Sequence, residues 1–360
     1  MSKHFNMKSK ENSGHFRTAF VQPKIPFAQD TFNGMPYRYL GSSGLRVSSI
    51  GLGTWKMGYH ESGDGSRIDE RTAFEIFDRA VDLGITFWDT ANRYNNASGN
   101  SERIIGAWIK QNHSLRRNVI LATKLGGCMD GLTPNHCGLS RTNIIESVYA
   151  SLERLQMDHI DLLYFHATDP LTPIEESLVA VEDLIRQDLV RYFAVSNFTA
   201  GQLDAYKTVE SKIALRSKMV AVQNQFDLLR GESDSFRGVY EFAVQNRISF
   251  IAWSPLGGGL LTDRYLVSDK VGAGDRLYDE GMMEMTNDFF LMEKLHKLAA
   301  LAHLWNMPLN QLVIAYMLTL PGMGPVIPAS SNIDQLESNA AASAIRITEE
   351  QIKRIKEAIN

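Results

Sequence analysis

The chain has 360 residues, of which 44% are hydrophobic and 22% are charged, and its formal net charge is −4. This composition is typical of a globular protein with a substantial core and excludes a disordered or low-complexity chain. The positive charges form no dense stripe, so the sequence predicts neither nucleic-acid binding nor attachment to an anionic membrane.

The N-terminal residues are polar and lack the apolar segment of a secretory signal. We expect residues 1–34 to form a polar N-terminal extension and residues 35–360 to form a single domain. The longest uncharged stretch, residues 308–332, is interrupted by Pro321, Pro325 and Pro328, so we do not expect it to span a membrane. A cytoplasmic location is predicted.

Strand-like and helix-like segments then follow one another along the chain. Two short strand-like runs flank residues 41–44, whose glycines and serines predict a β-hairpin. The predicted strands after it are residues 48–55, 86–91, 119–124, 160–166, 190–196, 219–225, 248–254 and 323–329. The predicted helices are residues 69–83, 101–111, 140–156, a helix that opens at Pro173 and is capped by Thr172, then 201–212, 236–246, 289–305, 309–319, 334–341 and 348–359.

About eight alternating strand and helix units, with strands rich in Val, Ile and Leu, favour an α/β fold of the (β/α)8 or TIM-barrel type with an N-terminal β-hairpin. A doubly wound open sheet is the alternative. Gly51, Gly53 and Gly58 resemble the glycines of a dinucleotide-binding turn, but residue 56 is Lys and no helix is predicted there. A P-loop is also absent, so a nucleotide would have to be bound in another way.

The chain has two cysteines, Cys128 and Cys137, in one glycine-rich loop, with His136 beside the second. Structural zinc sites use four ligands at short paired spacings, and no further cysteine completes such a set. We therefore expect no metal site and two free thiols in a reducing compartment.

Four polar residues stand at or just beyond the ends of predicted strands: Asp89, Tyr94, Lys124 and His166. Parallel strands bring their C-terminal ends together, so one site is expected. Hydride transfer to a carbonyl makes an alkoxide, which needs a proton donor. Tyr94 is the predicted acid. A neighbouring Lys124 cation would lower the phenol pKa, Asp89 would keep the buried ammonium charged, and His166 would orient the substrate oxygen.

Each of these residues taken alone also has an ordinary structural interpretation. The aspartate can cap the next segment, the tyrosine ring can pack in a loop, and the histidine can be a satisfied core residue. Lys124 is harder to explain in this way, because a charge at the end of an apolar run has a desolvation cost.

Several segments around these residues occur in a characteristic order: DTANRY from residue 89, GNSERIIG from residue 99, ATK from residue 122, AVSNF from residue 194 and WSPLGGGLLT from residue 253. This series resembles the aldo-keto reductase superfamily, and in particular the branch with bacterial general-stress reductases and potassium-channel β subunits. The resemblance covers roughly residue 37 to the C-terminus. It implies a (β/α)8 barrel, NAD(P)H-dependent carbonyl reduction, and the same roles for the four strand-end residues.

The resemblance also implies how a nicotinamide cofactor is bound. Ser196, Asn197 and Gln223 would hold the carboxamide, and Trp253 would take the place of a ring that stacks on the nicotinamide. The glycine-rich segment after it would offer backbone N–H groups to the pyrophosphate, and residues 262–288 would close over the cofactor. The implied cofactor-binding residues are Gly53, Thr54, Trp55, Ser196, Asn197, Gln223, Trp253, Ser254, Leu256, Gly258, Arg264, Ser330, Gln335 and Asn339.

The adenosine end of the cofactor is the main departure from the family pattern. Many members carry a Lys or Arg there for the 2′-phosphate, whereas this chain has Ala329, Ser331 and Gln335. We favour NADP(H) because it is the usual cofactor of the family, with NAD(H) as the alternative.

The leading functional prediction is an oxidoreductase that reduces a small-molecule aldehyde, ketone or sugar-like carbonyl. One alternative is a cofactor-binding regulatory protein of the channel-β type. His166 counts against this alternative, because the channel-β group resembles family members that have Asn at this position. Another is a nicotinamide-using isomerase, epimerase or lyase. Loops such as residues 56–66, 126–139 and 167–172 would set the substrate, with Trp55, Tyr59, Met129 and His136 as pocket walls.

Overall fold

The core of the fold is a curled parallel sheet, seen in a computed structural model that describes residues 30–129, 132–213, 218–266 and 271–360. Seven parallel strands pair in the order β4–β5–β6–β7–β8–β9–β11, and the short β10 adds an antiparallel edge to β9. Their bounds are β4 Gly51–Gly53, β5 Phe87–Asp89, β6 Ile120–Leu125, β7 Ile160–Phe165, β8 Val190–Ser196, β9 Met219–Asp227, β10 Gly231–Glu232 and β11 Ser249–Trp253.

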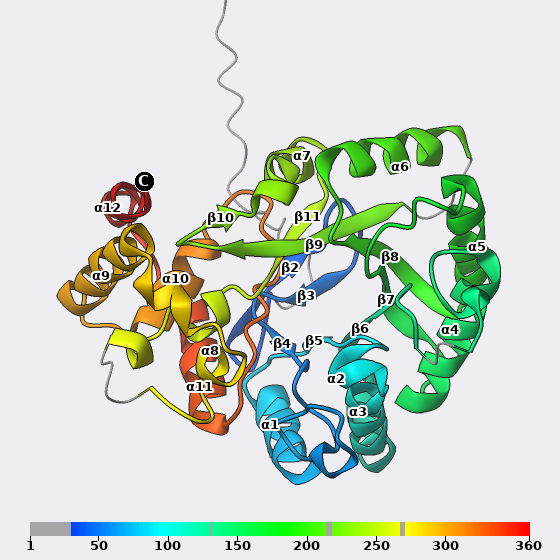
Figure 1. Cartoon of the computed structure of the whole chain (residues 1–360), viewed down its shortest axis with the longest axis horizontal. Coiled ribbons are helices and arrows are strands. Elements are labelled where there is room, and N and C mark those ends of the chain that lie inside the picture. The colour runs from blue at the N-terminus through cyan, green and yellow to red at the C-terminus, as the bar shows by residue number, and fades with distance from the viewer. Residues whose placement is uncertain (1–29, 130–131, 214–217, 267–270) are drawn as a thin grey trace, which may run out of the picture.

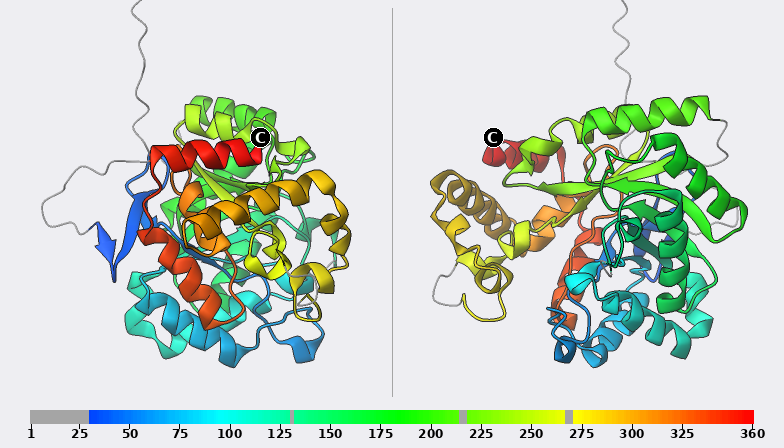
Figure 2. Two further views of the ribbon diagram at one scale, coloured as in Figure 1. Left: turned by 90° about the vertical axis from the view of Figure 1, so that its left-hand side faces the viewer. Right: turned by 45° about the vertical axis from the view of Figure 1, so that its right-hand side comes forward.

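The larger helices lie around the outside of this sheet (Figure 1). Helices α9, α10 and α12 form a group beside the end of β9, on the left of that view, and two turned views show the same wrapping (Figure 2). The bounds are α1 Glu70–Asp82, α2 Tyr94–Ala97, α3 Asn100–Gln111, α4 Arg141–Leu155, α5 Ile174–Arg186, α6 Ala200–Lys212, α7 Val239–Gln245, α8 Arg276–Asp279, α9 Phe289–Leu304, α10 Leu309–Met317, α11 Ile333–Ala341 and α12 Glu349–Ile359.

Helix starts follow from side chains that accept hydrogen bonds from the first free N–H groups. Ser140 caps α4 in this way, and Thr199 and Thr348 form complete capping boxes with Gln residues three positions later. The prediction that Thr172 caps α5 is wrong. Pro173 is the N-cap there, and the Thr172 hydroxyl donates to Asp169 instead.

The predicted N-terminal hairpin is confirmed as β2 (Met35–Tyr39) and β3 (Arg46–Ser48), which pair antiparallel. A further strand, β1 (Thr31–Phe32), pairs with β2 and lies within the predicted extension, most of which falls outside the described residues. The hairpin covers the N-terminal end of the sheet, since Gly41 N–H donates to Ser249 at the start of β11 and Tyr37 bonds Thr86 before β5. The opposite end of the sheet is left for a site.

The expected closed barrel is present only in part, because residues 323–329 form no regular strand. They make isolated parallel bridges instead: Val326 to Ile50, Ala329 to Gly53, and Met323 to Phe250. Proline has no N–H to give to a ladder, and this run contains Pro325 and Pro328. The sheet is therefore curled and rich in parallel strands but is not fully closed.

Two separate apolar clusters match this architecture. The smaller one lies inside the curl and combines strand residues with two hairpin residues and one residue of the bridging segment. It contains Leu40, Val47, Phe87, Ala122, Leu162, Tyr164, Ala194, Val220, Ala221, Ile251 and Ile327. The larger one fills the space between strands and helices. No helix in the described part of the chain has both the length and the apolar character needed to cross a bilayer.

Helices α3 and α4 approach closely at Gly106, which predicts a stability effect. A Cβ atom at this glycine would lie 2.2 Å from the carbonyl oxygen of Arg154. We expect Gly106→Ala to lower the free energy of unfolding by about 1–3 kcal/mol, measured by urea denaturation, although alanine is the better helix former. Gly201→Ala in α6 is the control, because nothing lies within 4 Å of its Cβ position. Equal effects of the two substitutions would contradict the close approach.

Candidate active site

Asp89, Lys124 and His166 come together because each stands at the C-terminal end of a neighbouring parallel strand. Asp89 is the last residue of β5, Lys124 is the penultimate residue of β6, and His166 directly follows β7. Tyr94 begins α2, five residues after Asp89. The side chains of Asp89 and Lys124 are only 2% and 1% exposed, so an ion pair is buried at this end of the sheet.

The Lys124 ammonium is the centre of the site. Its Nζ donates to Asp89 Oδ1 at 2.5 Å, to the Thr90 carbonyl oxygen at 2.9 Å and to the Tyr94 hydroxyl at 2.8 Å. An ammonium group has three donors, and all three are used. Burial lowers the pKa of Lys124, and the adjacent Asp89 carboxylate opposes that shift. The phenol in turn donates to Asp89 Oδ1 at 3.3 Å.

The pKa of the Tyr94 phenol is shifted in the direction opposite to the sequence prediction. Burial raises it well above 10, and the negative charge of Asp89 adds to the increase. The prediction weighed the ammonium but not the depth of burial or the carboxylate that accompanies it. Tyr94 therefore keeps its proton at neutral pH, which is the form that a proton donor needs.

His166 is held as a neutral imidazole. Burial lowers its pKa to about 3, and the charges of Lys124 and Arg93 contribute to this shift. Its Nδ1 atom is buried without a hydrogen-bond partner among the described residues. The ring centroids of Tyr94 and His166 are 6.0 Å apart. A neutral ring beside the phenol can offer an N–H to an oxygen atom placed between them.

Polar groups of β8, β9 and β11 extend the site. Asn197 donates to the backbone oxygen of His166 at 2.8 Å and accepts from the indole N–H of Trp253 at 3.0 Å. Ser196 donates to the Gln223 carbonyl oxygen at 2.8 Å. The Gln223 amide donates to Asp89 Oδ2 at 2.7 Å, so its nitrogen already has a partner. These four predicted cofactor residues thus form one hydrogen-bonded set, which reaches the candidate catalytic residues through Gln223 and Asn197.

The residues after β4 differ in how accessible they are. Thr54 is fully buried, and its hydroxyl donates to the Asp89 carbonyl oxygen at 3.1 Å. Trp55 is half-buried, with the Lys56 ammonium 4.3 Å and the Arg276 guanidinium 4.4 Å from its ring centroid. Of the two, Trp55 is the one that remains accessible to a ligand.

The glycine-rich segment after β11 turns through residues with positive φ angles, and the N–H groups of Gly257 and Gly259 donate to the carbonyl oxygens of Ser254 and Leu256 within it. Ser254, Gly257, Gly258 and Gly259 all have positive φ angles, between 59° and 103°. Successive N–H groups in such turns can converge on one anion. Leu256 lies within the same segment and is half-buried.

Arg264, predicted to add positive charge to this region, is already paired. Its guanidinium makes two hydrogen bonds to Asp275, at 2.8 and 3.0 Å. The described part of residues 262–288 also reaches the loop after β4. Arg67 pairs with Asp279 at 3.3 Å, and Lys56 lies 3.8 Å from Glu280. These ion pairs attach residues 262–288 to the loop after β4, next to Trp55.

The segment predicted to hold the adenosine end is polar but carries no cation. Ser331 donates through both its N–H and its hydroxyl to the side-chain oxygen of Gln335 at 2.9 Å. Asn339 donates to Ser330 at 3.2 Å, and both are buried. Ala329, Ser331 and Gln335 are exposed, so their side chains are open to a ligand.

The prediction of two free thiols is wrong, because Cys128 and Cys137 are joined by a disulfide. Nine positions of separation gave no signal for this bond, which depends on the fold of the loop that brings their Cα atoms to 4.4 Å. Disulfides are rare in reducing compartments, so the cysteines no longer support a cytoplasmic location, which stays a prediction. No group of three potential metal ligands occurs within the described ranges.

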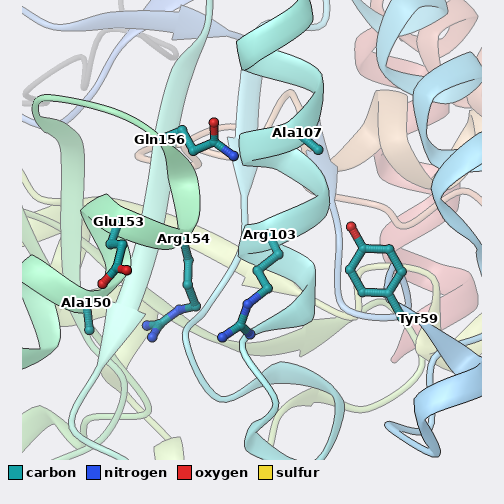
Figure 3. Close-up of a pocket in the computed structure, with 7 residues that line it drawn as sticks. All are labelled: Tyr59, Arg103, Ala107, Ala150, Glu153, Arg154 and Gln156. Carbon is teal, nitrogen blue, oxygen red and sulfur yellow. The ribbon is translucent and has the colours of Figure 1, made fainter.

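Tyr59, predicted as a wall of the substrate pocket, lies elsewhere. Its hydroxyl donates to Glu70 at 2.6 Å, and its ring borders a cavity of about 380 Å³ beside α3 and α4 (Figure 3). Arg103 of α3 and Arg154 of α4 also line this cavity. The cavity is on the helical outside of the sheet and contains none of the four catalytic candidates.

Two residues of the site were missed at the sequence level. Tyr164 is fully buried with its ring centroid 5.5 Å from Lys124 Nζ, and it pairs in register with Lys124 across β6 and β7. Its position near the end of β7, two residues before His166, was the available signal. Asn92 is fully buried, and neither atom of its amide has a partner in the described part of the chain. No sequence pattern distinguished it from an ordinary loop residue.

Comparison with known proteins gives the family. The aldo/keto reductase family model matches residues 49–360. The chain belongs to this family. It is 34% identical over 336 residues to the uncharacterized oxidoreductase YrpG of Bacillus subtilis (strain 168), covering 90% of this chain and 95% of that protein. It is 31% identical to a probable voltage-gated potassium channel subunit beta of Oryza sativa subsp. japonica, covering 86% and 91% of the two chains.

A further relative is the aldo-keto reductase AMT2 of Alternaria alternata, which is 29% identical over 89% of this chain and 90% of its own length. These relatives confirm the branch predicted from the sequence motifs. As an aldo/keto reductase, the protein is an NAD(P)H-dependent oxidoreductase.

The neutral state of His166 predicts a pH dependence of stability. The unfolded chain protonates this residue below pH 6.5, while the folded protein resists protonation down to about pH 3. The unfolded state therefore binds more protons in this window, so the free energy of unfolding falls as the pH drops. We expect the loss between pH 7 and pH 5 to be smaller by about 2 kcal/mol in His166→Asn, measured by urea denaturation.

The exposed His296 of α9 provides the control for this experiment. His296→Asn should lose as much stability as the wild type over the same interval. If His166→Asn also behaves like the wild type, the imidazole is not held neutral by burial.

Proposed function

We propose that the protein reduces an aldehyde, a ketone or a sugar-like carbonyl, with Tyr94 as the general acid. The observation that carries this proposal is the 2.8 Å hydrogen bond from the buried Lys124 ammonium to the Tyr94 hydroxyl. A phenol in this position can lose its proton to a developing alkoxide while a cation stabilises the phenolate that remains.

Each residue of the group has a distinct task in this mechanism. When bound, the reduced nicotinamide supplies the hydride. Tyr94 gives its proton to the substrate oxygen, and Lys124 remains bonded to the phenolate. Asp89 keeps the ammonium charged inside the protein. The neutral imidazole of His166 offers an N–H to the carbonyl oxygen before transfer, and this bond orients the carbonyl.

The donor set fits a nicotinamide dinucleotide. Asn197 and the buried Ser196 and Gln223 form a hydrogen-bonded polar group beside the half-buried ring of Trp253, and these four residues would hold the nicotinamide end. The positive-φ segment from Ser254 to Gly259 would bind the pyrophosphate, and Ser330, Gln335 and Asn339 would bind the adenosine end. The complete family barrel is proposed as well, with residues 323–329 serving as its eighth strand.

NADP(H) is the favoured cofactor because it is the usual one in the family. The absence of a cation at the exposed residues 329, 331 and 335 is the observation that keeps NAD(H) as the alternative. A second candidate function, a cofactor-binding regulatory subunit, is favoured by the names of the channel-β relatives. The two functions differ in whether the bound cofactor is oxidised when a carbonyl compound is added.

Removal of the Tyr94 hydroxyl tests the proposed acid. We expect Tyr94→Phe to lower kcat for 4-nitrobenzaldehyde by about 10²–10⁴-fold, because the alkoxide then lacks its proton donor. The rate is measured from the decrease in NADPH absorbance. Binding of NADPH, measured by fluorescence titration, should change little. Tyr149→Phe is the control, because Tyr149 is 52% exposed on α4.

Three outcomes are distinguishable in this experiment. Full turnover by Tyr94→Phe would contradict the proposed acid. Tight NADPH binding without turnover of any carbonyl by the wild type would favour the regulatory subunit. Conversion of a substrate without net oxidation of the cofactor would favour an isomerase, epimerase or lyase.

The cofactor preference can be tested by adding the missing cation. Ala329 is exposed, so Ala329→Lys introduces an ammonium without removing any side-chain hydrogen bond. We expect the ratio of kcat/KM for NADPH to that for NADH to rise roughly tenfold or more, because a hydrogen bond to a charged group contributes about 1.5–3 kcal/mol. Ala329→Gln is the uncharged control. An unchanged ratio in Ala329→Lys would remove residue 329 from the adenosine-phosphate site.

A further inference from the structure

Arg93 is a cation at the edge of the active site, next to the proposed acid. It directly precedes Tyr94 and its side chain is exposed. The stem of Arg93 lies across Gly127, since a Cβ atom built on that glycine would be 2.2 Å from Arg93 Cδ and 3.2 Å from its Cζ. Gly127 follows the end of β6 by two residues, so the guanidinium lies at the same end of the sheet as Lys124.

In the described part of the chain, no carboxylate pairs with this guanidinium. Among the described residues it makes no ion pair and no side-chain hydrogen bond, whereas the arginines of residues 262–288 are paired, Arg264 with Asp275 and Arg276 with Glu280. Asp169, on the loop after β7, is occupied by the N–H groups of Leu139 and Leu171 and by a hydroxyl.

The charge of Arg93 acts on His166 of the candidate active site. It is one of the two cations that help to lower the pKa of His166, after burial itself. The other cation, Lys124, is balanced by Asp89 at 2.5 Å. Of these two cations, Arg93 is therefore the one without a carboxylate partner among the described residues, and it offers a planar set of donors suited to carboxylate and phosphate oxygens.

We propose that Arg93 binds an anionic group of the substrate, so that the enzyme prefers carbonyl compounds that carry a carboxylate or a phosphate. The inference rests on the proposed carbonyl reduction and specifies its substrate class. Gly127 supports the Arg93 side chain. Because this glycine has no Cβ, the arginine stem can lie flat on its backbone, and this contact fixes the direction of the guanidinium.

The experiment uses matched substrate pairs that differ in charge. One pair is 4-carboxybenzaldehyde and its methyl ester, and the other is glyceraldehyde 3-phosphate and glyceraldehyde. For each pair, the ratio of kcat/KM for the anionic member to that for the neutral member is measured with the wild type, Arg93→Met and Gly127→Ala. We expect Arg93→Met to lower the ratio by roughly tenfold to a hundredfold, mainly through KM, as for the loss of a hydrogen bond to a charged group.

Gly127→Ala keeps the charge but displaces the stem, so we expect it to lower the same ratio by a smaller factor. Arg117→Met is the control for net charge, because Arg117 is exposed and precedes β6, at the opposite end of that strand. It should leave the ratio unchanged. A fall confined to the carboxylate pair or to the phosphate pair identifies which anion the site takes.

Equal ratios for the wild type and Arg93→Met in both pairs would overturn the inference while leaving carbonyl reduction intact. If the wild type reduces none of these compounds, the proposed function fails separately. The anion site is then measured by calorimetric titration of the NADPH-bound protein with benzoate and with benzamide. Binding of benzoate that is lost in Arg93→Met supports the inference, and no preference for benzoate over benzamide overturns it.

Discussion

The buried ion pair between Lys124 and Asp89 determines how the rest of this end of the sheet is built. An ammonium removed from water costs several kcal/mol unless its donors are satisfied and its charge is balanced. The pair forms at 2.5 Å because the two residues stand at the ends of adjacent strands, and the remaining donors of Lys124 reach the Thr90 carbonyl and the Tyr94 phenol. The position of the proposed acid is thus a by-product of satisfying one buried charge.

The same burial sets the protonation states of the neighbouring groups. Tyr94 keeps its proton because the phenolate would be desolvated and would face Asp89, and His166 stays neutral because an imidazolium would be desolvated and would face Lys124. Both groups are therefore donors in the resting protein. The hairpin of β2 and β3 seals the other end of the sheet, where Gly41 and Tyr37 bond to strand starts, so that stability and chemistry are separated along the strand axis.

Local patterns were sufficient for most of the elements and for the proximity of the four strand-end residues, whose catalytic roles stay predictions. The predicted strand at residues 190–196 has the bounds of β8, and the four strand-end residues lie together because strand order follows chain order from β4 to β9. Predictions failed where the outcome depended on how deeply a group is buried or on the path that a loop takes. Pro325 and Pro328 reduced the last strand to bridges, Thr172 turned to Asp169, and the two cysteines met in a disulfide. The sequence predicts which residues neighbour Tyr94. Only the fold shows that, for the pKa of the phenol, the effect of burial outweighs that of the Lys124 ammonium. The roles of the cofactor residues stay predictions, because proximity alone does not test them.

Gln223 has a consequence that extends beyond its proposed contact with the cofactor. Its amide occupies Asp89 Oδ2 while Lys124 occupies Oδ1, so the carboxylate is clamped from both sides by residues of β9 and β6. Gln223 and Lys124 follow Asp89 by 134 and 35 residues along the chain. The three positions thus behave as one mutational unit. Substitutions among them will be epistatic rather than additive, and drift at any one of these positions is constrained by the other two.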